Sequence, residues 1–394
     1  MNLDFHYYGT YCAAMEAGYA KEEAKKIAYF AQFVDECSAT LLDKNGIKKG
    51  NALFVPTVQS EIELLSPLKS SSEFTKDEIR TISKIWAPFH FLPGNTTGTE
   101  VKYDGPEKYV PNFIKKSLKI QEWNNNASER KKFHLLCLPN SDLVVDMVEC
   151  IREDVNGIGL TNKLEHIGMA MHVLADTWAH YWFAGTPAWH INDAEGTVYE
   201  HLEDGSKRSL LYIYDFVFKD NIEAGHYSCS PINIHYNGIC YLGHGRMGHL
   251  PDYSFITYDY IPMWKAGDGT KGSQRVLKNN PNVFMSAYTQ MVYALRCIKE
   301  NRPFQVEEYY KLEDGDRIGI RNILKTRKLD TSMEWKDYIK NKGYDEPAAF
   351  SAQAVFTAYQ NAVDKTNTDL VRFLHAASGH AETVERNVLS KCLE

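Results

Sequence analysis

The chain has 394 residues, of which 44% are hydrophobic and 24% are charged, so it can bury a large core and has the composition of a soluble globular protein. Its net charge of -7 and isoelectric point near 6.1 argue against a nucleic-acid binder that relies on a broad basic surface. Eight scattered cysteines without a CxxC pair, no signal peptide and no apolar run long enough to span a bilayer predict a cytoplasmic protein without a transmembrane segment.

The first part of the chain is predicted to be helical. Between Lys21 and Leu42, small and apolar residues recur at helical spacing, and Asp35 is the one carboxylate on that stripe. Asn45-Gly46 ends the helix. We expect residues 50–105 to be irregular chain that contains the strand-like run LFVPTV, a helix around Lys76–Trp86 and the aromatic turn FHFLPG.

The most informative segment is a predicted helix from Asn162 to Gly185, NKLEHIGMAMHVLADTWAHYWFAG. It places His172, Asp176 and His180 four residues apart, and positions four apart lie on the same face of a helix. Imidazole nitrogens and carboxylate oxygens are common zinc ligands, and burying them unpaired is unfavourable. The stripe therefore predicts a metal site.

Other helices are predicted on both sides of this segment. Shorter helical pieces precede it, at residues 112–122, 128–136 and 142–154, and further helices are expected at residues 282–301, 334–342 and 347–377. The intervening region, at about 187–260, is rich in Gly, Asn, Asp and Tyr. Its short runs SLLYIYDFVF and SPINIHY could each form a strand, a hairpin or a loop. We interpret the region as a long irregular insertion in a single, mainly α domain that spans residues 1–394.

Further candidate ligands are spread along the chain and would have to converge on the central helix. They are His6 in DFHYY, Asp35, His90 in FHFLPG, and three residues of the loop GHGRMGHLPDY, namely His244, His249 and Asp252. His6 and His90 are equally consistent with ligands and with buried structural histidines. Asp35 is also consistent with a buried carboxylate paired with a lysine or tyrosine. In the loop we favour His249 and Asp252 over His244.

The chain order of these residues resembles the zinc-dependent phospholipase C and P1 nuclease family, which has an all-helical fold. The runs FHYYGTYCAAMEAGYAKEEAKKIAYFAQFVDE, FHFLPG and LEHIGMAMHVLADTWAHYWFAG also resemble a bacterial family of unknown function related to that fold. The resemblance implies a multi-helix bundle with up to three zinc ions that cleaves a phosphate ester.

Carried over to this chain, the resemblance implies one ligand set for paired ions and another set for a further ion. The first set is Asp35, His90, His172 and Asp176, and the second is His180, His249 and Asp252, with His6 near a third ion. The chain departs from the family at its start, where Asp4 is a candidate substitute for the family's N-terminal Trp, and in the spacing of its last pair. These departures favour one or two ions over three.

Two functions of different class fit these observations. The first is a zinc-dependent hydrolase that acts on a phosphate ester or phosphodiester through a metal-activated water, with Asp35 bridging the ions or orienting that water. The second is a non-catalytic scaffold or binding protein that metal ions stabilise. Iron and manganese remain alternatives to zinc. The sequence indicates neither the substrate nor the oligomeric state.

Overall fold

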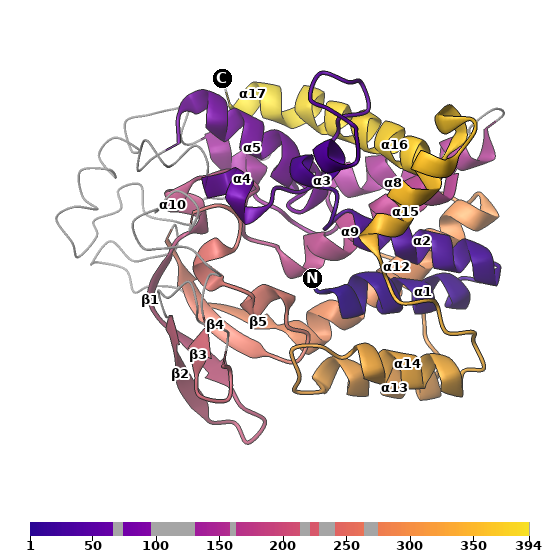
Figure 1. The fold of residues 1–394 in the computed structure, drawn as a ribbon. Coiled ribbons are helices and arrows are strands. Elements are labelled where there is room, and N and C mark those ends of the chain that lie inside the picture. Colours follow the sequence, from indigo (N-terminus) through magenta and orange to yellow (C-terminus); the bar gives the residue numbers. More distant parts are fainter. Residues whose placement is uncertain are drawn as a thin grey trace.

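A computed structural model describes residues 1–65, 74–95, 131–157, 163–212, 221–227, 241–263 and 275–393. Helices fill most of this part of the molecule, and a small sheet lies at one end of it (Figure 1). A π-helical segment, Asp4–Gly9, leads directly into the first α-helix. The α-helices are α1 (Thr10–Glu16), α2 (Lys21–Phe33), α3 (Ala39–Lys44), α4 (Glu61–Leu65), α5 (Lys76–Phe89), α8 (Asp142–Asn156), α9 (Lys163–Ala179), α10 (Trp189–Asn192), α12 (Asn280–Glu300), α13 (Asp314–Lys325), α14 (Ser332–Asn341), α15 (Ala352–Asn361), α16 (Asp369–Val384) and α17 (Ser390–Cys392).

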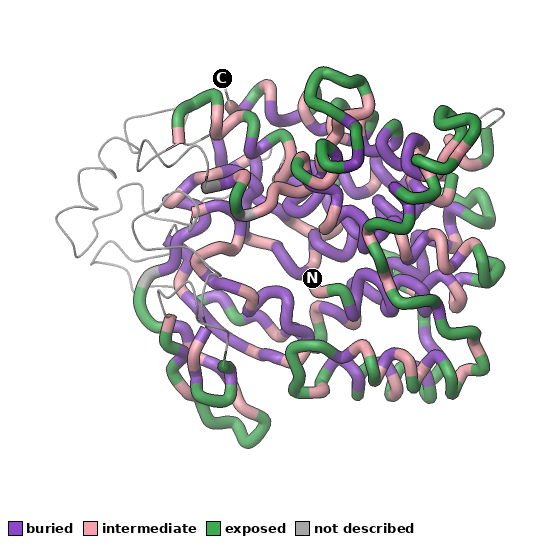
Figure 2. Tube along the Cα trace, viewed as in Figure 1, coloured by how far each residue is buried: buried purple, intermediate pink, exposed green. Residues whose placement is uncertain are grey.

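Helix α9 is the centre of the helical part. Every residue from Ile167 to Thr177 is buried, and α9 contacts α2, α5, α8, α12 and α16 (Figure 2). A helix that is apolar on all sides is stable only when other elements surround it. Gly168 lets α2 approach closely, because a Cβ atom there would lie 2.5 Å from the carbonyl oxygen of Ile27. His172 and Asp176 of α9 therefore lie in the middle of the molecule.

The sheet has five strands in the order β3-β2-β1-β4-β5. The strands are β1 (Ala194–His201), β2 (Lys207–Tyr212), β3 (His226–Tyr227), β4 (Thr257–Pro262) and β5 (Val276–Asn279). Neighbouring strands are antiparallel except β2 and β3, which are parallel. The strands of the sheet contribute Val198, Tyr258 and Tyr260 to a hydrophobic cluster that also contains Phe91 and Phe183. This cluster joins the sheet to the chain that leaves α9.

The predicted fold class, a mainly α bundle with a long irregular insertion, is wrong. Helices dominate, but the region predicted to be irregular supplies β1 to β4, so the fold is mixed. Buried charges on the strands hid the alternating pattern of a sheet. Glu200, Asp259 and Lys278 are almost fully buried at positions where a strand pattern calls for apolar residues. The partners of Glu200 and Asp259 come from other strands and loops, and Lys278 contacts backbone carbonyls at the end of α9. Local spacing carries no signal for such contacts.

The helical predictions agree more closely with the structure. Helices α5, α8, α12 and α14 lie where periodicity placed them. The helix predicted from Lys21 to Leu42 is divided into α2 and α3, and the helix predicted from Asn162 to Gly185 ends at Ala179. The helix predicted over residues 347–377 is interrupted, because the chain leaves α15 at Ala362 and re-enters a helix only at Asp369. The run LFVPTV forms only an isolated bridge between Ser38 and Val58.

Some predicted elements cannot be compared with the structure. The helix predicted at residues 112–122 lies outside the described residues. In the part of the chain that the structure describes, no helix is long and apolar enough to cross a membrane.

Candidate metal centre

Three sets of histidine and aspartate side chains converge beside α9. The first set is His6, His172 and Asp176; the second set is Asp35, His90 and His172; the third set is His180, His244 and Asp252. Within each set, one ligating atom from every residue lies within 4.8 Å of the others, so each set could hold a metal ion. We refer to the three sets together as the metal centre.

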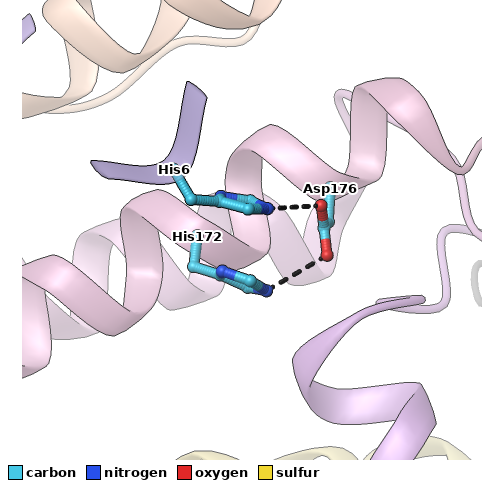
Figure 3. A group of neighbouring side chains, drawn as sticks. All are labelled: His6, His172 and Asp176. Atoms are coloured by element: carbon cyan, nitrogen blue, oxygen red, sulfur yellow. Dashed lines mark hydrogen bonds and ion pairs between the residues drawn. The ribbon is translucent and has the colours of Figure 1, made fainter. Parts of the chain in front are cut away.

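The first set is completely buried and is built on one face of α9. Helix α9 supplies His172 and Asp176, and the π-helical segment before α1 supplies His6 (Figure 3). The two Nε2 atoms each lie 3.1 Å from an oxygen of Asp176, His6 from Oδ1 and His172 from Oδ2. The imidazole rings stack at 3.8 Å between centroids and an interplanar angle of 20°. Both rings thus present the same nitrogen to one carboxylate.

The second set shares His172 with the first and reaches toward the surface. His90 follows the last residue of α5, and its Nδ1 lies 3.2 Å from His172 Nε2 and 3.3 Å from Asp176 Oδ2. Asp35 follows the end of α2, and its Oδ1 lies 3.7 Å from His90 Nδ1 and 3.8 Å from His172 Nε2. The side chain of Asp35 is 28% exposed, whereas that of Asp176 is 1% exposed. Among these acids, solvent therefore reaches Asp35 most readily.

The third set joins the end of α9 to the glycine-rich loop. His180 Nε2 lies 3.0 Å from Asp252 Oδ1, and His244 Nε2 lies 3.6 Å from Asp252 Oδ2. Gly243 and Gly248 flank the short helix Gly245–Met247 with φ angles of 53° and 54°, in the left-handed region that glycine adopts without strain. These two turns bring His244 back toward Asp252.

Backbone carbonyls fix the orientation of three of the imidazoles. His90 Nε2 donates to Thr57 O at 2.9 Å, His180 Nδ1 to His90 O at 2.8 Å, and His244 Nδ1 to Gly248 O at 2.7 Å. A carbonyl oxygen only accepts hydrogen bonds, so in each neutral ring the other nitrogen carries a lone pair and faces the metal centre. Metal-binding histidines have this arrangement. His6 and His172 lack it, since among the described residues Nδ1 of each ring is buried without a hydrogen-bond partner.

The short contacts within the third set fit a cation. In the neutral state of His180, its Nε2 lone pair faces a carboxylate oxygen only 3.0 Å away, and two lone pairs at that distance repel each other. Two ligands of one zinc ion, each bound at about 2.0–2.2 Å, lie roughly 3–3.6 Å apart. The separations of 3.0–3.3 Å around Asp176 and Asp252 therefore match those of atoms that share an ion.

The amino group of Met1 lies between the first and third sets. Its nitrogen is 2.9 Å from Asp176 Oδ1, 3.1 Å from Asp252 Oδ1 and 3.5 Å from His180 Nε2. Burial lowers the pKa of this amine, but the charges of Asp176 and Asp252 outweigh burial and raise the pKa to about 11. A positive charge thus already occupies the space between these two carboxylates, and a metal ion would compete with it.

The electrostatics of the centre keep Asp176 and Asp252 charged and the imidazoles of His6 and His244 neutral. Burial raises the pKa of Asp176, but His180, the amino group, His172 and His6 together hold it well below its usual range. Burial, together with a second imidazole, lowers the pKa of His6 to about 4, and burial does the same for His244. Metal ligation requires deprotonated carboxylates and neutral imidazoles, and these groups already have that form at neutral pH.

The structure brings most of the candidate residues together. His6, Asp35, His90, His172, Asp176, His180 and Asp252 all belong to the three sets. The third set contains His244, whereas the sequence led us to favour His249 as its ligand. The ring of His249 instead lies beside Tyr253, with centroids 6.1 Å apart, and His249 is in none of the three sets found among the described residues. Asp4 accepts hydrogen bonds from Thr331, immediately before α14, rather than facing the centre.

Sequence reasoning missed the Met1 amino group and the carbonyls of Thr57 and Gly248. Backbone groups carry no residue-type signal, so no motif could have indicated them.

Comparison with known proteins places the chain in a family. A protein-family model matches residues 1–388. The chain belongs to DUF6765, a family of unknown function. No curated protein and no solved structure matches the chain. None of these comparisons shows a similarity to the phospholipase C and P1 nuclease family.

Proposed function

We propose that this protein is a metal-dependent hydrolase that acts on a phosphate ester or phosphodiester. The main support is the arrangement of His90, His180 and His244. Each directs one nitrogen toward a carboxylate of the centre, Asp176 for His90 and Asp252 for the other two, while a backbone carbonyl accepts a hydrogen bond from the other nitrogen. Five imidazoles and three carboxylates meet within one small region, and coordination of a divalent cation accounts for all of them.

We propose zinc as the metal, because neutral imidazole nitrogens with carboxylate oxygens suit zinc better than magnesium or calcium. The first and second sets share His172, and Asp176 lies beside both. The third set begins with His180, four residues after Asp176 and just past the end of α9. This division supports more than one ion. Iron and manganese accept the same ligands, and elemental analysis distinguishes them.

The residues of the centre have different roles in this proposal. Asp176 contacts His6, His172 and His90 and would hold the metal. Asp35 is partly exposed and receives a hydrogen bond from Gln32 at 3.5 Å, so it would orient water or accept its proton. A bound zinc ion supplies the remaining chemistry, because it lowers the pKa of water to about 7 and polarises a phosphoryl oxygen.

The test is metal content and phosphodiesterase activity of the purified full chain. We expect zinc by elemental mass spectrometry, hydrolysis of bis(4-nitrophenyl) phosphate, loss of hydrolysis with a chelator and its return with zinc. His172→Ala should lose metal and activity, whereas His375→Ala, which changes an exposed histidine on α16, should lose neither. Asp35→Asn should reduce turnover about a hundredfold or more while metal stays at the residues of the first and third sets, and Asp337→Asn, at an exposed position, is its control.

One observation favours the second candidate, a scaffold that metal stabilises. His6, His172 and Asp176 are at most 1% exposed, as expected for a structural site closed to water. If zinc is bound in full and no phosphoester in a broad panel is turned over, the scaffold replaces the hydrolase.

A cytoplasmic location is also part of the proposal. Its support is that the six cysteines among the described residues are all unpaired.

A further inference from the structure

A buried lysine on β5 contacts the end of α9. Lys278 is 0% exposed, and its Nζ donates hydrogen bonds to Ala179 O at 2.6 Å and to Tyr181 O at 3.1 Å. Nζ also lies 3.7 Å from the centroid of the Tyr181 ring. Among the described residues, no carboxylate lies within ion-pair distance of Lys278. The usual reason for burying a lysine, a charge partner, is therefore missing here.

The two carbonyl groups that Lys278 contacts lie on either side of His180. Helix α9 ends at Ala179, and the chain then turns sharply so that Phe183 N donates to His180 O at 3.1 Å. In this turn Trp182 has a φ angle of 75°, a left-handed conformation that is a strained outlier for a bulky residue. Such a turn persists only where its surroundings hold it. Lys278 binds the turn from the sheet side, and Cys137 O accepts a hydrogen bond from Trp182 N at 3.0 Å.

The position of this turn matters because His180 is a member of the third set. Its Nδ1 donates to His90 O and its Nε2 lies 3.0 Å from Asp252 Oδ1. His180 is the first residue after α9. A small rotation of the backbone there would therefore move both ring nitrogens relative to His90 O and Asp252. The ring has no hydrogen bond of its own to Lys278, so any influence passes through the backbone.

We propose that Lys278 is a positioning residue of the metal centre, whose side chain fixes the carbonyls on both sides of His180 and so holds this imidazole against Asp252. The proposal rests on the metal binding in the proposed function but not on the phosphoesterase activity. It assigns a role in the centre to the sheet, which otherwise supplies none of the ligands.

The test compares metal binding by Lys278→Met with that of Asp252→Asn, which removes a ligand of the third set directly. Lys278→Met keeps the length of the side chain and removes its donors. We expect it to weaken binding of the third-set ion by about tenfold to a hundredfold, as loss of a group that orients a ligand does. Metal bound at the first and second sets, which share His172, should remain. The double variant should lose no more metal than Asp252→Asn alone.

The controls separate positioning from general damage to the fold. Lys325→Met removes a surface lysine that pairs with Glu203 and should leave metal content unchanged. If Lys278→Met does not fold, Lys278→Gln retains one donor group and replaces it in the comparison. A fully loaded third set in the folded variant, or an equal loss from all sets, would overturn the proposal.

A measurement on the metal-free chain keeps the proposal testable even if the protein takes up no metal. In ¹⁵N-histidine spectra, Nδ1 of wild-type His180 should carry a proton, because it donates to His90 O. Lys278→Met should lose this signature or mix it with the other tautomer, and an unchanged His180 signal would overturn the proposal. Failure of the hydrolase proposal would show instead as bound metal without turnover.

Discussion

At the residue scale, Asp176 connects the parts of the metal centre. Its two oxygens contact His6, His90, His172 and the amino group of Met1. Burying a charged carboxylate without partners costs a large free energy, and the four nitrogen atoms around Asp176 offset that cost. The same surroundings would suit a carboxylate that ligates a metal ion.

The choice between His244 and His249 gives a prediction with matched variants. His244 faces Asp252 and has its other nitrogen fixed by Gly248, whereas His249 lies beside Tyr253. We expect His244→Ala to lose the third-set ion and His249→Ala to retain it, measured by zinc content after dialysis against a weak chelator. Loss of the ion in His249→Ala and its retention in His244→Ala would instead support His249, the residue favoured from the sequence, as the ligand.

Lys278 gives a prediction about pH. Burial lowers its pKa to about 7, whereas an unfolded lysine has a pKa of about 10.4. Between these values the unfolded chain binds a proton that the folded chain does not, so the folded chain becomes more stable as pH rises.

Relative to Lys278→Met, the metal-free wild type should therefore gain up to about 1.4 kcal/mol of unfolding free energy per pH unit above about pH 7. Urea unfolding of both proteins at several pH values, with chelator present, measures this difference. A difference that stays constant with pH would show that the lysine remains charged when buried.

At the scale of elements, the close contact of α2 with α9 aligns Asp35 with His172. Gly168 makes the contact possible, because any Cβ there would meet the Ile27 carbonyl at 2.5 Å and Phe30 Cβ at 2.8 Å. Backbone atoms cannot move aside as a flexible side chain can. The distance between the two helices is therefore fixed by this glycine.

Gly168→Ala should force α2 away from α9. We expect a loss of about 1–3 kcal/mol of unfolding free energy, typical of overpacking, together with weaker metal binding in the second set. Gly379→Ala, in α16, is the matched control, because a Cβ there meets nothing within 4 Å and the change should be neutral or stabilising by up to about 1 kcal/mol. Thermal unfolding and metal titration of both variants test the prediction, and equal effects in both would contradict it.

The same elements explain how much the sequence could predict. The alignment of His172, Asp176 and His180 followed from helix periodicity alone, since four residues make about one turn whatever surrounds them. His244 could not be chosen over His249, because the choice depends on the left-handed turns at Gly243 and Gly248 rather than on spacing. The sheet was missed because its strands bury charges, such as Glu200 with Arg208 and Arg327, and those pairs form only after folding.

At the scale of the whole molecule, the metal centre joins segments that are far apart in the chain. Its ligands come from residues 6 to 252, and they link the N-terminal helices, α9 and the loop that precedes β4. An ion that binds only the folded chain stabilises it by about 4 kcal/mol when its concentration is a thousand times the dissociation constant.

Removing the metal should therefore lower the melting temperature by several degrees and make the glycine-rich loop around His244 exchange amide hydrogens faster. Helices away from the centre, for example α13, should keep their protection, because α13 packs against α12 and α14 rather than against the segments that supply the ligands. Hydrogen exchange with and without chelator measures both effects. If chelation changes neither the melting temperature nor the exchange, the centre holds no ion that matters for stability.

The central claim is that these imidazoles and carboxylates surround a metal ion. The most direct measurement is an anomalous difference map from a crystal of the zinc-loaded protein, recorded on both sides of the zinc absorption edge. We predict peaks between Asp176 and its histidines and between His180, His244 and Asp252. A map without anomalous density at either place, from protein that had been given zinc in excess, would contradict the account.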